Sequence, residues 1–414
     1  MIGIIMEYIK SLPLDIIEIN IYNKNLSILP DLSRFTCLQK LDCSGNQLIQ
    51  LSNLPSSLLE LNCSRNRIIR LDTLPPYLQI LECLGNQIKH LDNLPHSLQI
   101  LDCPYNQIIQ LDNLPSSLKE LYCHRNQITQ LNNLPTSLLK LDCTCNQITQ
   151  LDNLPSLQKI DCSFNQIAQL DNLPSSLLKL SCLCNQITQL DNLPSFLQEL
   201  RCSNNQITQL DNLPSSLQVL SCSNNQIIQL DNLPSFLQEL RCSDNQITQL
   251  DNLPSSLQIL YCYHNQLTQL DNLSSSIIKL DCSHNRLTQL TQLTQLTQLN
   301  NSPFSLQILN CSNNQIKQLD NLSSSLQILE CNNNQITQLN NLPPSLIILN
   351  CSNNQITQLD NLPLSLQKIN CSYNQITQLD NLPRSLYFLI CKTMKSIVKI
   401  YANIFESQYI LEII

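Results

Sequence analysis

A phrase of twenty residues recurs along most of this chain, and it limits the possible folds more than any other feature. The segment LRCSNNQITQLDNLPSS at residues 200–216 returns as LRCSDNQITQLDNLPSS at residues 240–256. Aligned copies have a leucine or isoleucine anchor two residues before a position that is almost always cysteine. The anchors are Ile19, Leu41, Leu61, Leu81, Leu101, Leu121, Leu141, Ile160, Leu180, Leu200, Leu220, Leu240, Leu260, Leu280, Leu309, Leu329, Leu349, Ile369 and Leu389. A repeat this short cannot enclose its own core, so we expect the copies to stack, each contacting only its neighbours.

Composition restricts the class of protein further. The chain has 414 residues, of which 42% are hydrophobic and 13% charged, as in a folded protein rather than a disordered one. No apolar run approaches the roughly 20 residues of a membrane span. The start, MIGIIMEYIKSLP, lacks the basic region and the cleavage site of a signal peptide. The net charge is −8 and there is no basic stripe, so we expect no membrane and no nucleic-acid partner.

Each repeat is predicted to contain one short β-strand. In the LxLxC pattern alternate residues point the same way, so leucine and cysteine face a core and the residues between them face outward. Twenty residues leave no room for a strand, turns and an ordinary helix of about 11 residues. The LDNLPSS segment is therefore expected to be extended or polyproline-like. The asparagine column that runs from Asn46 to Asn374 is expected to turn inward and satisfy backbone groups at the bend.

The repeat L-P-x-S-L-x-x-L-x-C-x-x-N-Q-I-x-x-L-D-N resembles the leucine-rich repeat, whose strand core is L-x-x-L-x-L-x-x-N/C-x-L. It is most similar to the short twenty-residue class of bacterial type III effector proteins and to the repeat arrays of giant-virus proteins. The resemblance covers about residues 12–391. It implies an α/β-class repeat solenoid, a horseshoe with a parallel β-sheet on its concave face and an extended convex side.

The same register predicts how the chain is organised. We expect an N-terminal cap with a degenerate first repeat over residues 1–40, and about 18 repeats over residues 41–391. Nine extra residues at 291–299 (TQLTQLTQL) should loop out without breaking the stack. Residues 392–414 carry apolar side chains at helical spacing, including Tyr401, and are predicted to form a short C-terminal capping helix.

The cysteines are predicted to be packing residues. Eighteen of the 21 occupy one core column, from Cys43 to Cys391, and a buried thiol behaves as a small apolar side chain. Disulfides are disfavoured because in-register parallel strands hold neighbouring Cβ atoms farther apart than the roughly 3.8 Å that a bridge prefers. A single file also lacks the tetrahedral grouping of a zinc site. So many unpaired thiols imply an intracellular, reducing compartment such as the cytoplasm.

Three patterns resemble metal sites, and each has a simpler explanation. Asp244, His264 and His284 share the column just before the asparagine and could hold one ion, but the composition of a variable column explains them as well. Cys145 and Cys184, in the same column, are interpreted as exposed thiols. The aspartates of LDNLP could attract Ca²⁺, although asparagine replaces them in some repeats, which favours a role in turns. We predict no metal, no cofactor and no catalytic site.

The residues that flank the anchor and the cysteine vary most between repeats and are predicted to face outward. Their charges form pairs two residues apart on single strands: Lys40/Asp42, Lys140/Asp142, Lys159/Asp161, Lys279/Asp281, Glu199/Arg201 and Glu239/Arg241. Tyrosine and arginine are enriched at binding hot spots. The residues predicted to bind a partner are Tyr105, Tyr122, His124, Arg125, Phe164, Arg201, Arg241, Tyr261, Tyr263 and His264.

The resemblance and these surface residues together predict a monomeric, non-enzymatic module that binds a protein partner through the concave face of its sheet. The alternative is a structural or loosely selected array without a defined ligand. The near-identical CSNNQIT rungs that begin at Cys202, Cys222, Cys311 and Cys351 favour this alternative, because uniform rungs offer little to recognise.

Overall fold

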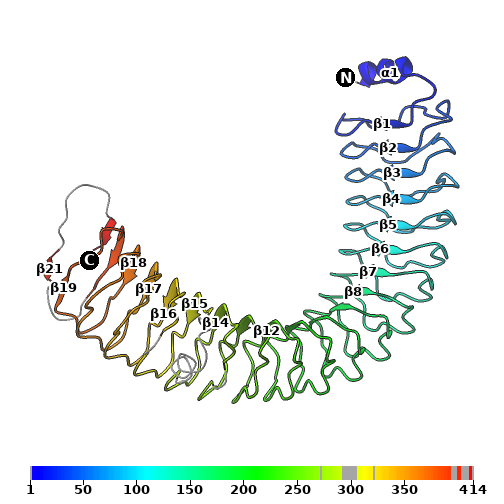
Figure 1. Ribbon diagram of the computed structural model, residues 1–414. Helices are drawn as coiled ribbons and strands as arrows, with labels where there is room; N and C mark the ends of the chain where they lie inside the picture. The colour runs from blue at the N-terminus through cyan, green and yellow to red at the C-terminus, as the bar shows by residue number, and fades with distance from the viewer. Residues whose placement is uncertain are drawn as a thin grey trace. The chain divides into compact units, whose positions relative to one another are not determined.

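The computed structural model describes residues 2–270, 273–290, 305–319, 322–392, 399–401 and 410–412. It divides into two compact units, Met1–Asn205 and Gln206–Ile414, which we call the N-terminal and C-terminal units and describe separately. Each unit is a stack in which every repeat contributes one short strand, called a rung here (Figure 1). The repeat solenoid predicted from the sequence is therefore confirmed within each unit.

The rungs of the N-terminal unit form one parallel sheet. They are β1 (Glu18–Asn20), β2 (Lys40–Asp42), β3 (Glu60–Asn62), β4 (Ile80–Glu82), β5 (Ile100–Asp102), β6 (Glu120–Tyr122), β7 (Lys140–Asp142), β8 (Lys159–Asp161), β9 (Lys179–Ser181) and β10 (Glu199–Arg201). The anchors lie opposite one another in register: Ile19 pairs with Leu41, and Leu41 with Leu61. This is the register expected when identical repeats stack, because a shift of one residue would turn every anchor away from the core.

The C-terminal unit repeats this arrangement. Its main sheet contains β11 (Val219–Ser221), β12 (Glu239–Arg241), β13 (Ile259–Tyr261), β14 (Lys279–Asp281), β15 (Ile308–Asn310), β16 (Ile328–Glu330), β17 (Ile348–Asn350), β18 (Lys368–Asn370), β20 (Phe388–Ile390) and β22 (Ile410–Glu412). A second, two-stranded sheet pairs β19 (Gln378–Asp380) with β21 (Lys399–Tyr401). The insertion at 291–299 lies outside the described residues, but β14 and β15 on either side of it pair in register. The stack therefore continues across the insertion, as predicted.

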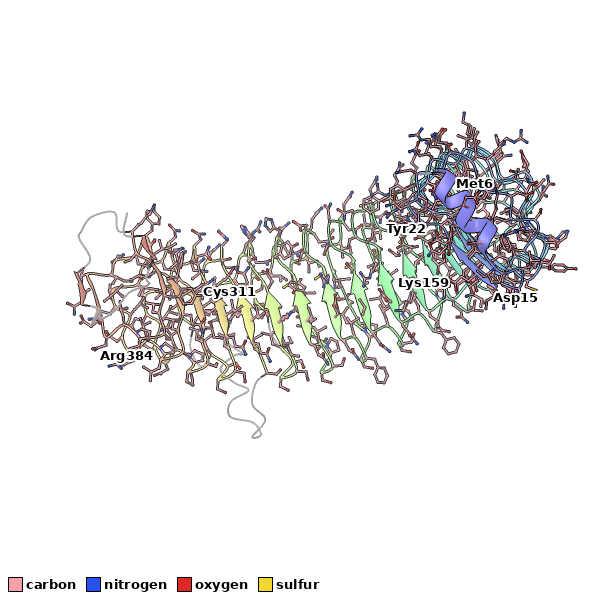
Figure 2. The ribbon with its side chains drawn as sticks, turned by 90° about the horizontal axis from the view of Figure 1, so that it is seen from above. Met6, Asp15, Tyr22, Lys159, Cys311 and Arg384 are labelled. Atoms are coloured by element: carbon pink, nitrogen blue, oxygen red, sulfur yellow. The ribbon has the colours of Figure 1, made fainter. Side chains whose placement is uncertain are left out.

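Within each rung the central residue is buried and its two neighbours face outward, half-buried or exposed. Figure 2 shows the rungs following one another as a ladder with side chains projecting on both sides. In β5, Leu101 is fully buried between the half-buried Ile100 and Asp102. The core consists of repeated leucines, isoleucines and cysteines, and most of them have no exposed surface. Burial of such side chains contributes about 1.5–3 kcal/mol each to folding, so the stack is held together by a continuous apolar column.

The side of each repeat opposite the rung is not helical. The LPxSL segment forms a turn in which the leucine N–H donates to the proline carbonyl, as Leu118 does to Pro115 at 3.0 Å. A further backbone bond joins neighbouring repeats, as from Gln107 N to Ile88 O at 2.9 Å. The short repeat thus closes through turns, as its length predicts. Among the described residues, no helix is long and apolar enough to cross a membrane.

The two ends differ from the prediction. A helix that the sequence did not predict, α1 (Ile2–Ser11), precedes β1, and Arg34 Nη2 donates to the Ile9 and Lys10 carbonyls at its end, at 2.7 and 3.0 Å. At the other end, the described residues of the predicted capping helix are strands: β21, which contains Tyr401, pairs with β19, and β22 pairs with β20. The helix prediction is wrong for these residues. The tail is rich in isoleucine, which favours strands, and the unpaired edge of the sheet provides a partner for them.

Candidate protein-binding surface

The core columns are unavailable to a ligand. Every cysteine of the ladder has no exposed surface except Cys391, which is 5% exposed, and none of the 21 cysteines, all of which the structure describes, forms a disulfide. Burial raises the pKa of most of these thiols, and it raises that of Cys222 to about 12. Some thiols also contact the next rung, as Cys162 Sγ does at 3.4 Å from the Ser181 carbonyl oxygen. The packing role predicted for the column is confirmed, and a protonated, buried thiol is a poor nucleophile.

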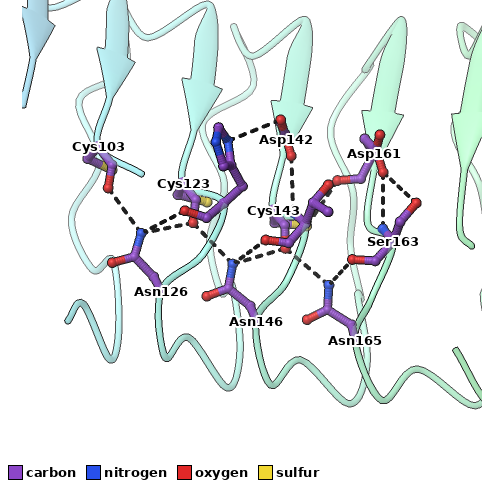
Figure 3. A network of polar contacts seen from close by, with 11 residues as sticks. Cys103, Cys123, Asn126, Asp142, Cys143, Asn146, Asp161, Ser163 and Asn165 are labelled. Carbon is purple, nitrogen blue, oxygen red and sulfur yellow. Dashed lines mark hydrogen bonds and ion pairs between the residues drawn. The ribbon is translucent and has the colours of Figure 1, made fainter. Parts of the chain in front are cut away.

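The asparagine column also has the structural role that was predicted (Figure 3). Asn146 Oδ1 accepts the backbone N–H of Ile128 at 3.0 Å, and its Nδ2 donates to the carbonyls of Cys123 and Cys143 at 3.1 and 3.0 Å. The same bonds recur in neighbouring repeats, as at Asn165. The bend after each rung leaves these backbone groups without a strand partner, and the amide provides one.

A second ladder was missed in the sequence. The serine of LPxSL donates its hydroxyl to a leucine carbonyl of the preceding repeat: Ser117 Oγ to Leu98 O and Ser137 Oγ to Leu118 O, both at 2.6 Å. The recurrence of serine at this position was the signal that could have revealed it. This ladder, like the asparagines, is structural, and the binding surface must be sought among the variable columns.

The variable column just before the asparagine adopts left-handed backbone, which the sequence analysis did not predict. This conformation costs a residue with a side chain roughly 1–2 kcal/mol, least for asparagine and aspartate. Gly45, Gly85 and several asparagines suit the column. Tyr105, Arg125 and Phe164, with φ of 52°, 54° and 55°, do not. Glycine and asparagine in one column were a sequence signal for this geometry.

The first predicted aromatic group is assembled on adjacent rungs of the N-terminal unit. The Tyr105 ring meets the His124 ring edge-on, with centroids 5.8 Å apart, and Arg125 Cζ lies 5.0 Å from the centre of the Tyr105 ring. His124 Nδ1 lies 3.3 Å from Asp142 Oδ2 (Figure 3) but has no hydrogen-bond partner among the described residues. Tyr105 is about half exposed. These three side chains form one continuous surface.

The remaining N-terminal residues are placed separately. Tyr122 Oη donates to Glu120 Oε2 at 2.7 Å on the same rung. Burial and this hydrogen bond raise the pKa of Tyr122 to about 12. Phe164 is half exposed, and no ring contact joins it to the first group among the described residues. Arg201 Nε pairs with Glu199 Oε1 at 2.6 Å.

The second predicted group lies in the C-terminal unit. Arg241 pairs with Glu239 on its own strand, and its Cζ lies 5.0 Å from the centre of the Tyr261 ring. The rings of Tyr263 and His264 meet edge-on, with centroids 5.6 Å apart. The structure therefore joins the predicted residues of this group in two contacts, Arg241 with Tyr261 and Tyr263 with His264.

The suspected metal trio has a different geometry from a coordination site. His264 stacks on His284, with centroids 4.1 Å apart and 27° between the planes, and its Nδ1 is 3.8 Å from Asp244 Oδ1. Burial lowers the pKa of His284, and the His264 ring lowers it further. Within the described residues no three His, Cys, Asp or Glu side chains are grouped to hold a metal. That this chain binds no metal stays a prediction.

The predicted same-strand charge pairs are correct for the two arginines and wrong for Lys40 and Lys140. Lys40 Nζ pairs with Glu60 Oε2 on the next rung rather than with Asp42, and Lys140 Nζ pairs with Glu120 Oε1 rather than with Asp142, both at 2.8 Å. The flexible lysine side chain reaches a neighbouring rung about 4.8 Å away. Among the described residues, Asp42 and Asp142 therefore have no lysine partner.

The aspartates of LDNLP were expected to have a role in turns, but several of the described ones accept a side-chain amide instead. Asp112 and Asp152 accept the amide of the glutamine two residues earlier, Gln110 or Gln150, at 2.8 and 2.7 Å. The turn is formed instead by the following asparagine in left-handed backbone, as at Asn113 with φ of 56°. The carboxylates therefore stay on the exposed side of the turn.

The comparisons with known proteins agree with this architecture. A family model described as "Leucine Rich repeats (2 copies)" matches residues 195–235 and 215–255. No curated protein sequence matches the chain. The structure is similar to that of YopM from Yersinia enterocolitica WA-314, at 33% identity and a TM-score of 0.81, over 92% of this chain and 88% of that one.

Two other solved structures are similar. The functional domain of InlJ from Listeria monocytogenes, which includes a cysteine ladder, matches 83% of this chain with 76% of its own, at 26% identity and a TM-score of 0.61. The plant peptide hormone receptor RGFR1 in complex with RGF2 matches 91% of this chain with 69% of its own, at 21% identity and a TM-score of 0.61, and shows the fold alone. Similarity to giant-virus arrays stays a prediction. This chain belongs to the leucine-rich repeat family, as its repeat register, its hydrogen-bond ladders and its 33% sequence identity to YopM show.

Proposed function

We propose that the chain is a non-enzymatic protein-interaction module that binds a protein partner through the outward face of its sheet. The observation that supports this most is the left-handed column of the N-terminal unit. Tyr105, Arg125 and Phe164 occupy positions where asparagine or glycine would cost less conformational energy. Large side chains retained at such a cost, in the bends that follow the rungs, favour a role in recognition.

Two further observations support the proposal. YopM from Yersinia pestis, another solved structure that resembles this chain, is a leucine-rich effector protein. The described cysteines of the ladder form no disulfide, which fits a reducing, intracellular location. The second candidate function, an expanded array without a defined ligand, is favoured by the near-identical rungs that begin CSNNQI at Cys222, Cys311 and Cys351 of the C-terminal unit.

Site-specific photo-crosslinking tests the proposal. A photoreactive phenylalanine analogue replaces Tyr105, in the bend that follows β5, or, as control, Tyr77, which is 65% exposed in an LPxSL-type turn of the same unit. Crosslinking in cells that produce the protein should give one dominant protein adduct from position 105 and none from position 77. Equal adducts from both positions, or none from either, would refute the proposal and favour the array without a ligand.

A further inference from the structure

Two neighbouring rungs of the N-terminal unit, β4 and β5, have an outward face unlike that of the rungs beside them. The residue before the anchor is isoleucine, Ile80 or Ile100, whereas the flanking rungs have glutamate there, as at Glu120. The residue after the anchor is acidic, Glu82 or Asp102. All four outward side chains of β4 and β5 are half-buried. The two rungs thus present an apolar strip beside two carboxylates, which we call the β4–β5 patch (Ile80, Glu82, Ile100 and Asp102).

The repeat normally supplies hydrogen-bond donors to an aspartate at this position. In β2, Ser44 donates both its backbone N–H and its hydroxyl to Asp42 Oδ1, at 2.9 and 2.5 Å. The aspartates of β7, β8 and β14 each accept the corresponding N–H. In β5 the donor residue is Pro104, which has no N–H and no hydroxyl. In β4 it is Leu84, which has no hydroxyl.

Nearby cations do not replace these donors. Lys40 and Lys140 are held by glutamates of the rungs on either side of the patch. In the part of the chain that the structure describes, no hydrogen bond or ion pair reaches the carboxylate of Glu82 or Asp102. A half-buried carboxylate without hydrogen-bond donors has lost part of its hydration, and no protein hydrogen bond compensates for this loss. Such groups bind an incoming cation more strongly than fully hydrated carboxylates do.

The pKa shifts of the titratable groups around the patch agree with an excess of negative charge there. Burial raises the pKa of Glu82, and the neighbouring Asp102 raises it further. Burial also raises the pKa of Asp102; His124 opposes this and Asp142 adds to it. The pKa of Tyr122, on the next rung, is raised by burial and by the surrounding carboxylates. Negative charge therefore accumulates over these rungs, opposed at Asp102 only in part by His124.

We propose that the β4–β5 patch binds a lysine or arginine side chain from an extended, basic segment of the partner protein. The cationic group lies between Glu82 and Asp102, and its methylene stem covers Ile80 and Ile100. Lysine and arginine combine these two properties, an apolar stem and a charged head. The complementary charge supplies specificity and a faster association. This inference rests on the proposed function, since it names the chemistry of the partner at that face.

Fluorescence anisotropy with defined probes tests the inference on the full chain. The probes are a labelled peptide Gly-Arg-Ser-Arg-Ser-Arg-Gly and the same peptide with glutamine in place of arginine. The test variant is Glu82→Gln with Asp102→Asn. The fold accepts amides in this column, because Asn310 and Asn350 occupy it in β15 and β17. Asp92→Asn with Asp112→Asn is the charge-matched control, since it removes two exposed carboxylates of the same unit away from the sheet.

The wild type and the control should bind the arginine peptide with equal affinity, and the test variant at least about tenfold more weakly. The glutamine peptide should bind to none of them. Absence of binding to the wild type, or an equal loss in the control, would overturn the inference. So would micromolar Ca²⁺ binding that the test variant abolishes, since the patch would then be a metal site. If the Tyr105 adduct persists in the test variant, the inference fails while the proposed function stands.

Discussion

Replacement of Asn146 by alanine should weaken the stack locally and by a calculable amount. The side chain is buried and joins two repeats through three main bonds: one accepted from Ile128 N and two donated to the carbonyls of Cys123 and Cys143. An alanine side chain makes none of these bonds. Because the repeat places an equivalent asparagine in nearly every rung, this perturbation tests the main polar device of the fold.

The three bonds do not count equally. Removal of the amide leaves the buried N–H of Ile128 without an acceptor, which costs about 1–3 kcal/mol. The Cys123 and Cys143 carbonyls each keep a second asparagine donor, from Asn126 and Asn165. Each lost bond there is therefore worth at most about 1 kcal/mol. The expected total for Asn146→Ala is about 1–5 kcal/mol.

The loss should be confined to neighbouring repeats, because each repeat contacts only those beside it. Hydrogen exchange followed by mass spectrometry measures this directly, since protection of amides near residues 120–150 should fall while that of distant repeats is unchanged. Gln147→Ala is the matched control, as this side chain is adjacent in sequence but exposed. Asn146→Asp provides a further check: it should destabilise at neutral pH, where the carboxylate faces two carbonyls, and recover when acid protonates it.

If Asn146→Ala and Gln147→Ala have the same exchange profile, the hydrogen-bond ladder does not hold the repeats together and the reasoning is refuted. A loss of protection that spreads through the whole N-terminal unit would instead contradict nearest-neighbour stacking. Either result would be visible without any assumption about a partner.

Other substitutions test the remaining arguments. Because burial raises the pKa of Glu82, its ionised form destabilises the fold above that pKa. The substitution Glu82→Gln should therefore raise the free energy of unfolding by about 0.2–1 kcal/mol at neutral pH. Urea denaturation measures this gain, which should vanish in acid. Phe164→Asn should stabilise by about 1 kcal/mol through its left-handed backbone, unlike Phe196→Asn, which lies outside that region. Thiol titration should label few of the 21 cysteines before denaturation and nearly all afterwards; ladder disulfides would contradict this. Deletion of residues 394–414 removes β21 and β22 and should cause aggregation, and a soluble protein with unchanged melting would show that the tail is no cap.

The repeat made much of this structure predictable. Strand positions, register, burial of the cysteines and the inward asparagine all follow from which residue recurs at which place in twenty. These properties depend on contacts between identical positions of adjacent copies, so periodicity alone is enough to place them. Paired anchors such as Leu41 and Leu61 needed no further information.

The binding surface was only partly predictable, because its contacts join different residues on different rungs. Sequence proximity suggested Lys40 with Asp42, whereas the side chain reaches Glu60 across the sheet. The tail was assigned a helix from its spacing, but an open sheet edge is a tertiary feature, and it pairs with the described strands there. The lack of a hydrogen-bond donor to Asp102 was likewise not predictable from the sequence. In other rungs the backbone N–H two residues after the aspartate is the donor, and Pro104, at that place in β5, has no N–H. The sequence by itself determined the stack, because stacking repeats one local pattern. Only the tertiary structure decided which outward charges are compensated, because that depends on neighbours twenty residues away.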